Sequence, residues 1–205
     1  MDNVTHSLAG LLLAESTARL RARGGNTEPS ARFGAVAAVS SILAANLPDS
    51  DLFYSGIGGD RLRYMLHHRG YTHTVVVAVL AAVLLWAIVA LVVRWRGKAW
   101  PAKDDARWLL ALFLAGTLSH LVLDWTNSYG VHPFWPFDDR WRYGDAVFIV
   151  EPWLWIVSVP ALVAASTSRI ARVLLSLVLL AALGLAWRVN AVSTGAAITL
   201  TRAAG

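Results

Sequence analysis

The segment HTVVVAVLAAVLLWAIVALVV, residues 73–93, decides the fold class of this 205-residue chain. It contains no Asp, Glu, Lys or Arg, and a helix of about 20 apolar residues is long enough to cross the ~30 Å hydrocarbon core of a bilayer. Backbone N–H and C=O groups cannot remain unpaired in lipid, and the sequence lacks the alternating pattern of a transmembrane β-barrel. We therefore predict an all-α fold, a polytopic membrane helical bundle.

Further apolar segments lie on both sides of this one. We expect helices over residues 33–47, 107–126, 148–166 and 170–188, and a shorter helix over 4–18 that inserts partway or packs against its neighbours. About five to six helices then form one transmembrane domain over residues 1–188. The Ala-, Thr- and Gly-rich segment 189–205 is expected to be a loosely ordered C-terminal tail.

The composition supports residence in lipid. Hydrophobic residues make up 57% of the chain and charged residues 15%, whereas a soluble domain carries about 25% charged residues. The net charge of +5 does not indicate nucleic acid binding, because Lys and Arg lie in short connections beside apolar segments. The chain has no Cys, which excludes disulfides and thiolate metal ligands. The N-terminal segment lacks the basic region and cleavage site of a signal peptide, so we expect it to stay on the mature protein.

The distribution of Lys and Arg predicts the orientation of the bundle. If residues 4–18 enter the bilayer from the side where 48–72 emerges, eleven of the 18 Lys and Arg residues fall on one side and seven on the other. The richer side is expected to be cytoplasmic by the positive-inside rule. The opposite side is then extracytoplasmic.

Ionisable residues gather on the predicted extracytoplasmic side. All six His residues lie there, together with the Asp residues of PDSD (48–51) and SHLVLDW (119–125). A charged side chain at membrane depth costs about 2.5–3.5 kcal/mol on insertion scales, so such residues are normally paired, act as ligands or line a cavity. Their convergence predicts one polar site.

Two of these motifs also have a purely structural interpretation. His120 and Asp124 are four residues apart and share a helix face, where they can ligate one ion or join two helices through a hydrogen bond. Pro48 ends a helix, after which Asp49 and Asp51 can point toward the bundle or form an exposed turn. Both interpretations stay open for each motif taken alone.

The HHRGYTH segment, residues 67–73, holds three of the six histidines. Gly70 permits a tight turn and Thr72 is expected to cap the helix that His73 begins, but this does not account for the histidines. Mixed imidazole and carboxylate ligands suit Zn²⁺, with Mn²⁺ and Fe²⁺ as alternatives, and the number of candidate ligands leaves room for one or two ions. We therefore predict a divalent-metal site.

Five motifs occur in order along the chain: MDNVTHSLAG, ANLPDSD, HRGYTH, LSHLVLDWTNSYG and WRYGDAVFIVEPW. Together they resemble the YdjM-type membrane-bound metal-dependent hydrolases, from residue 1 to about residue 165. The resemblance implies a metal-dependent hydrolase of the bacterial inner membrane. Its motif positions in this sequence are His6, Asp49, Asp51, His68, His73, His120 and Asp124, and more loosely Asp145 and Glu151.

The order of these residues is also similar to that of the zinc-dependent phospholipase C and P1 nuclease group, helical enzymes that split phosphoesters. On this analogy Asp124 bridges two ions, with His6 on one and Asp49, His120 and either His68 or His73 on the other. A third ion, on His132 and Glu151, stays open. The candidate metal ligands are therefore His6, Asp49, His68, His73, His120, Asp124 and Glu151.

The leading hypothesis is hydrolysis of a phosphoester or other ester bond in a lipid or other membrane-associated substrate. The candidate catalytic residues are Asp49, Asp51 and His73. The candidates to bind an anionic headgroup are Arg69, Arg140 and Arg142, which would otherwise contact solvent or lipid phosphates. Four aromatic residues are expected to cover the site or to anchor in the interface: Phe134, Trp135, Phe137 and Trp141.

Two other classes of function use the same residues. A transporter or metal-handling membrane protein would use them as a transit or proton-relay site, and a non-catalytic scaffold would hold a structural metal. The candidate ligands cluster at one end of the predicted helices rather than near the midplane, and the chain has no inverted repeat. These features favour hydrolysis over transport.

Overall fold

The structure, a computed structural model, describes residues 1–24, 31–52, 69–96, 105–166 and 168–204. Its contacts divide the chain into two units, Met1–Val150 and Glu151–Gly205, which are described separately. The described residues form helices, turns and two isolated β-bridges. The predicted all-α fold is therefore confirmed.

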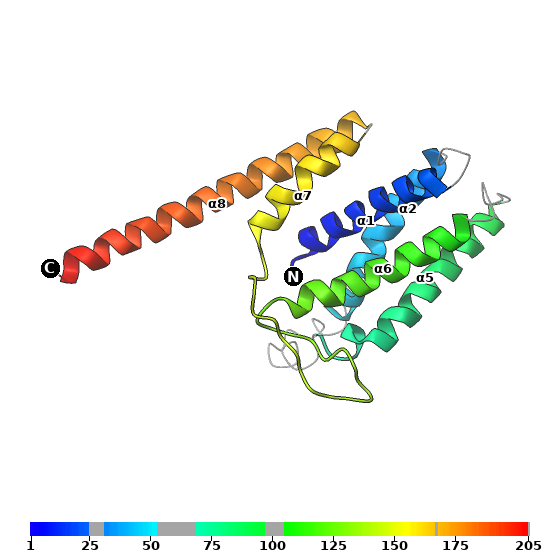
Figure 1. Cartoon of the computed structure of the whole chain (residues 1–205), viewed down its shortest axis with the longest axis horizontal. Helices are drawn as coiled ribbons and strands as arrows, with labels where there is room; N and C mark the ends of the chain where they lie inside the picture. Colours follow the sequence, from blue (N-terminus) through cyan, green and yellow to red (C-terminus); the bar gives the residue numbers. More distant parts are fainter. Residues whose placement is uncertain (25–30, 53–68, 97–104, 167, 205) are drawn as a thin grey trace. The chain divides into compact units, whose positions relative to one another are not determined.

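The described residues of the first unit form four α-helices and two 3-10 turns. These are α1 (Asn3–Gly24), α2 (Ala31–Asn46), η1 (Leu47–Asp51), η2 (Tyr71–His73), α5 (Val75–Trp95) and α6 (Asp105–Trp125). Helix α6 contacts α1, α2 and α5, and α1 also packs on α2 (Figure 1). The start of α1, the end of α2, the start of α5 and the end of α6 meet at one end of the unit.

Local sequence determines where two of these helices begin and end. Pro48 follows the end of α2 and lies in the first turn of η1, where its missing N–H costs nothing. The backbone N–H of Val77 donates to the Thr74 hydroxyl at 3.2 Å, which caps the start of α5. The predicted capping by Thr72 is wrong, because Thr72 lies inside η2 and α5 begins only at Val75.

Two glycines allow the helices of the first unit to approach closely. A Cβ on Gly10 of α1 would lie 2.7 Å from the Ser41 carbonyl oxygen of α2, and one on Gly116 of α6 would lie 3.0 Å from the Ala44 Cβ of α2. The Ser41 hydroxyl also donates to the Gly10 carbonyl at 2.7 Å. Small residues at helix contacts are the usual means of close packing in membranes.

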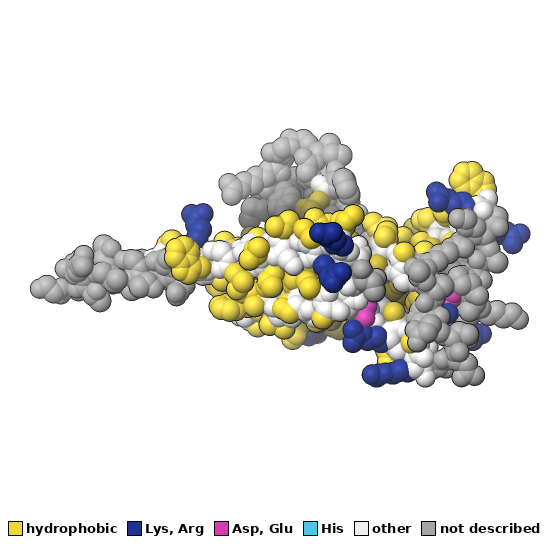
Figure 2. Space-filling model, turned by 90° about the horizontal axis from the view of Figure 1, so that it is seen from above, with side chains coloured by type: hydrophobic (Ala, Val, Ile, Leu, Met, Phe, Trp, Pro, Cys, Tyr) yellow, Lys and Arg dark blue, Asp and Glu magenta, His cyan; other side chains and the backbone are white. Residues whose placement is uncertain are grey.

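Within the described part of the chain, three helices are long and apolar enough to cross a membrane: α5, α6 and the Arg169–Val189 part of α8. Hydrophobic side chains predominate among the described residues on the face drawn in Figure 2, where no His side chain is visible. The buried core of the first unit lies between the helices and consists of small and large apolar side chains: Ala14, Phe33, Ala37, Ala44, Ala82, Leu109, Leu112 and Phe113. Lipid-facing apolar surface and a packed interior both agree with a membrane bundle.

The second unit consists of α7 (Pro152–Ala165) and α8 (Arg169–Ala204), which pack on each other. Helix α8 continues past residue 188, which differs from the loosely ordered tail predicted over 189–205. Ala is the strongest helix former and Thr costs less than 1 kcal/mol. A single isolated Gly in this stretch therefore does not end the helix.

Residues 126–150 connect α6 to the second unit without a helix. Two β-bridges, Asn127 to Val147 and Val131 to Arg142, hold this segment together. The backbone N–H of Val75 donates to the carbonyl of residue 133 at 2.8 Å, and that of residue 2 donates to the carbonyl of residue 149 at 3.0 Å. The segment therefore contacts the starts of α5 and α1.

Candidate metal centre

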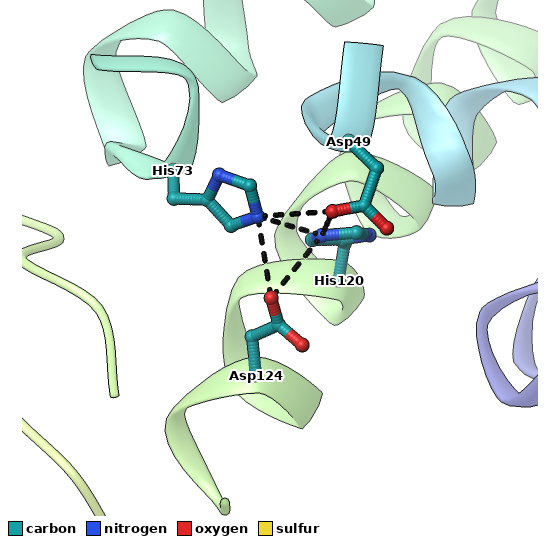
Figure 3. A group of neighbouring side chains, drawn as sticks. All are labelled: Asp49, His73, His120 and Asp124. Atoms are coloured by element: carbon teal, nitrogen blue, oxygen red, sulfur yellow. Dashed lines mark hydrogen bonds and ion pairs between the residues drawn. The ribbon is translucent and has the colours of Figure 1, made fainter. Parts of the chain in front are cut away.

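Four buried side chains converge where the ends of the first unit's elements meet. Asp49 comes from η1, His73 from η2, and His120 and Asp124 from successive turns of α6 (Figure 3). One ligand atom of each residue lies within 4.8 Å of the others. The structure thus brings together three sequence motifs that lie up to 75 positions apart, from Asp49 to Asp124.

The spacing of the four ligand atoms fits one metal ion. The Nε2 atom of His73 lies 3.3 Å from an Asp49 oxygen and 3.2 Å from Asp124 Oδ2. The Nε2 atom of His120 lies 3.5 Å from each of the same two oxygens and 3.1 Å from His73 Nε2. Zinc bonds of 2.0–2.2 Å in a tetrahedron place neighbouring ligand atoms roughly 3.3–3.6 Å apart. Three of the five distances fall in this range and the other two are 0.1–0.2 Å shorter, so the four ligand atoms lie close enough together to share one ion.

Hydrogen bonds orient the His120 ring for metal binding. Its Nδ1 atom lies 2.6 Å from the Ala45 carbonyl oxygen, which can only accept, so Nδ1 carries the proton. Nε2 then presents its lone pair to the cluster. The close contact of Gly116 with Ala44 holds this part of α2 against α6, so helix packing sets the ring's position.

His73 is oriented in the same sense by a chain of two hydrogen bonds. The Thr72 hydroxyl donates to Asp51 Oδ2 at 2.9 Å and lies 3.0 Å from His73 Nδ1. Because the hydroxyl proton points to Asp51, the Thr72 oxygen accepts from a protonated Nδ1. The lone pair of His73 Nε2 then faces that of His120 at 3.1 Å. Two facing lone pairs beside two carboxylate oxygens are stabilised by a cation between them.

Asp51 lies behind His73 and outside the four-residue cluster. Its carboxylate is 3.6 Å from His73 Nδ1, accepts the backbone N–H of Arg69 at 2.8 Å, and is fully buried. A carboxylate in this place fixes the ring and raises the basicity of the other nitrogen. The predicted catalytic role of Asp51 stays a prediction, and its position favours orientation of His73.

The second oxygen of Asp124 faces a different set of groups. Oδ1 accepts from the α-amino group of Met1 and from Arg69 Nη2 at 3.2 Å, and it lies 3.4 Å from His6 Nε2. The His6 ring stacks on His120 with centroids 3.7 Å apart. Among the described residues, neither ring nitrogen of this fully buried histidine has a hydrogen-bond partner. A buried imidazole whose nitrogens have no hydrogen-bond partner, beside a carboxylate, has the chemistry of a metal ligand.

At neutral pH the cluster has the protonation state that metal binding requires. Burial by itself raises the pKa of Asp49, but the interactions of its carboxylate with the His120 and His73 rings outweigh it and hold the pKa below its usual value. Burial lowers the pKa of His73 to about 4, although the nearby Asp49 carboxylate opposes this shift. Ionised carboxylates and neutral imidazoles are the metal-ligating forms.

The remaining predicted site residues are His68, Arg140, Arg142 and Glu151. His68 lies outside the described residues, and Glu151 begins the second unit directly before α7. Arg140 and Arg142 pair with Asp138 at 2.8 and 3.0 Å. Their predicted contact with a headgroup stays a prediction.

Arg69 has a different environment from the one expected of a headgroup ligand. It is 5% exposed, and its guanidinium donates to Asp124, to Asn127 Oδ1 at 3.0 Å and to the Gly130 carbonyl at 3.3 Å. The backbone of Arg69 adopts a φ of 61°, rare for a residue with a side chain. Its guanidinium therefore supports Asp124 and connects it to the 126–150 segment.

The aromatic residues of the 126–150 segment have different environments. Trp135 makes an edge contact with Tyr71 of η2, with centroids 4.8 Å apart, close in sequence to His73. Trp141 contacts the ring of His132, also at 4.8 Å. Phe137 is 87% exposed, so it is available to the membrane interface rather than to the site.

One of three comparisons with known proteins found a match. The model of the YdjM inner membrane protein family matches residues 1–193. The chain belongs to the YdjM inner membrane protein family. This confirms the YdjM family drawn from the five motifs, while the hydrolase activity and the similarity to phospholipase C and P1 nuclease stay predictions. The three membrane-capable helices among the described residues agree with the family's inner-membrane name. No curated protein and no solved structure matches this YdjM-family chain.

Sequence reasoning missed three groups of the YdjM-family site. The Ala45 carbonyl and the Met1 amino group belong to the backbone and carry no residue-type signal. Thr72 was assigned to helix capping, yet it connects Asp51 to His73. The adjacency of Thr72 to His73, with an Asp pair in another motif, was the available signal.

Proposed function

We propose that this YdjM-family protein is a membrane-embedded, metal-dependent hydrolase that cleaves a phosphoester or other ester bond of a membrane-associated substrate. One observation carries the proposal: four buried ligand atoms lie within 4.8 Å of one another, close enough to share one ion, and two imidazole lone pairs face each other among them. The expected ion is Zn²⁺, with Mn²⁺ as the alternative.

The burial of each side chain suggests which residues of the cluster would bind the ion and which would act on water. His73, His120 and Asp124 are fully buried, whereas Asp49 is 7% exposed. The three buried residues would hold the ion, as three protein ligands do in catalytic zinc sites. A bound divalent ion lowers the pKa of water toward about 7 and so supplies a nucleophile at neutral pH. Asp49, the least buried of the four, would complete the ligand set or accept the proton of the attacking water.

His6 supports a second ion in the same centre. Asp124 directs Oδ2 to His73 and His120, and Oδ1 to His6. Oδ1 also accepts from the Met1 amino group and from Arg69, so a second ion held by His6 and Asp124 would take the place of one of these donors. Two ions would together stabilise the charge that develops on the oxygens of a phosphoester displacement. This supports a phosphoester as the substrate bond.

The extracytoplasmic placement of the centre belongs to the same proposal. The cluster lies at the start of α5 and the end of α6, on the side opposite the more basic connections, which the positive-inside rule assigns to the cytoplasm.

A structural metal in a non-catalytic scaffold is the second candidate. The near-complete burial of all four ligands favours it, since structural zinc sites are four-coordinate and closed. The two functions differ in one measurable property. A catalytic centre hydrolyses a substrate and a structural one only stabilises the fold.

The test is metal content together with hydrolysis. The full chain is purified in detergent, its metals are quantified by elemental mass spectrometry, and release of phosphate from phosphatidic acid and of p-nitrophenol from p-nitrophenyl phosphate is measured. Asp124→Asn removes the bridging charge, and Asp138→Asn makes the same change at a residue that pairs with Arg140 outside the cluster.

We expect one or two zinc ions per chain, lost in Asp124→Asn and kept in Asp138→Asn, with hydrolysis following the metal. His6→Gln would lose one of two ions. Metal-free protein that stays folded would refute the metal centre. Zinc-loaded protein without hydrolysis of either ester would favour the structural metal.

A further inference from the structure

An apolar groove of about 270 Å³ lies between η1 and α5. Its lining begins at Pro48 and Ser50 of η1 and Thr72 of η2, and continues along α5 through residues that include Val77, Ala81 and Ile88. All of these residues belong to the first unit. None of the four candidate metal ligands lines this groove.

One end of the groove is lined by residues that adjoin two of the candidate metal ligands. Pro48 and Ser50 flank Asp49 in η1, and Thr72 precedes His73 and contacts its Nδ1 at 3.0 Å. The hydroxyl-bearing residues of the lining, Ser50 and Thr72, are both at this end. The groove is therefore polar only where it meets the centre.

The rest of the groove follows one face of a membrane-crossing helix. The α5 residues that line it recur every three or four positions between Val77 and Ile88, a distance of about 16 Å along a helix. Helix α5 is a candidate membrane span, and both Leu84 and Ile88 of the lining are exposed. In a membrane the groove would open to the hydrocarbon region.

We propose that this groove binds one acyl chain of a lipid substrate, whose phosphoester lies at the metal centre. The inference rests on the proposed hydrolase function and narrows its substrate to an amphiphile with a phosphate headgroup. A polar end beside the metal ligands and an apolar channel along a membrane span match the two parts of such a molecule. A water-soluble phosphoester would leave the channel unused.

Ala81 provides the site of the test because its small side chain leaves room in the groove. Ala81→Leu places three more carbons in the channel. Ala87→Leu is the matched control, since Ala87 lies on the same helix, is exposed and does not line the groove. Leu at a lipid-facing helix position costs little in a membrane.

The experiment uses a long-chain lysophosphatidic acid with a diazirine near the methyl end of its chain. Zinc-loaded full chain in detergent is irradiated with this probe, and labelled peptides are identified by mass spectrometry. We expect labelling of α5 around Leu84 and Ile88. We expect it to fall roughly tenfold in Ala81→Leu, the factor for about two methylenes displaced from apolar contact, and to stay unchanged in Ala87→Leu.

Further comparisons distinguish a failure of the proposed groove from a failure of the proposed hydrolase function. Equal labelling of Ala81→Leu and Ala87→Leu would overturn the groove. Labelling that is the same in Asp124→Asn, or with a monoacylglycerol of the same chain, would mean a structural lipid only and would overturn the substrate assignment. Phosphate-dependent labelling without hydrolysis of any ester would refute the proposed function and, with it, the substrate assignment, while leaving a lipid site. Ala81→Leu that still hydrolyses p-nitrophenyl phosphate but loses the long-chain probe would support both.

Discussion

Gly116→Ala tests whether close packing of α2 on α6 builds the metal centre. The new Cβ would lie 3.0 Å from the Ala44 Cβ, whereas carbon atoms in contact prefer about 3.5–4.0 Å, so the helices must separate by about 0.5 Å. Overpacking of this kind costs about 1–3 kcal/mol, and Ala in place of Gly returns about 0.5–1 kcal/mol of helix propensity. Gly34→Ala is the matched control, because no atom lies within 4 Å of its added Cβ. The difference between the two variants is then the packing strain, about 1–3 kcal/mol.

The assay is thermal unfolding of the detergent-purified variants, followed by zinc titration. The strain corresponds to a melting temperature roughly 2–12 °C lower for Gly116→Ala than for Gly34→Ala. His120 lies one turn from Gly116 and donates to Ala45 at 2.6 Å, and metal-ligand distances tolerate only about 0.2 Å. Zinc affinity should therefore fall about 10–100-fold. A Gly116→Ala protein as stable as Gly34→Ala, with equal zinc affinity, would refute the role given to this helix contact.

Three further predictions concern neighbouring groups. Asp51→Asn keeps its size but weakens the support of His73, so zinc affinity measured by titration should fall about 10–100-fold, and an unchanged affinity would exclude the orienting role. The pKa of His73 is lowered to about 4 in the folded state, so between about pH 4 and 6.5 the unfolded chain binds a proton that the folded chain does not. The free energy of unfolding of the metal-free protein should therefore fall as the pH falls through this range. In His73→Gln, the dependence of this free energy on pH should be weaker. Asp105 and Arg21 form a buried ion pair at 2.5 Å at the other end of α6. Asp105→Asn should lower the free energy of unfolding, measured with a chemical denaturant, by about 3–5 kcal/mol and leave the zinc content unchanged. Loss of zinc in this variant would contradict the separation of the two sites.

The metal ligands were predictable to different extents. His120 and Asp124 could be paired from sequence, because a helix places residues four apart on one face. Sequence places Asp49 and His73 at the same end of the bundle but does not predict that they touch. The directions of their side chains depend on two 3-10 turns, η1 and η2, whose geometry the sequence does not give. His6 was named as a ligand, yet its stacking on His120 and its approach to Asp124 Oδ1 depend on how α1 packs.

For the C-terminal segment, the sequence predicts less regular structure than is present. Its Ala-, Thr- and Gly-rich composition was interpreted as a loosely ordered tail, whereas α8 continues to Ala204. Composition without a hydrophobic period gives a weak prediction, because a helix already nucleated can extend through any run of good helix formers.

The sequence by itself determined the solvent, the fold class and the chemistry of the site. Hydrophobic run length decides membrane residence because the bilayer has a fixed thickness, and the motif order was enough to identify the YdjM family. Only the tertiary structure decided which candidate ligands lie close enough to share an ion, that Asp51 and Thr72 contact His73 from behind, and that a groove along α5 begins at Pro48 and Ser50. These features depend on the relative positions of side chains far apart in the sequence, to within a few tenths of an ångström. Packing between helices sets these positions, and no local sequence pattern does.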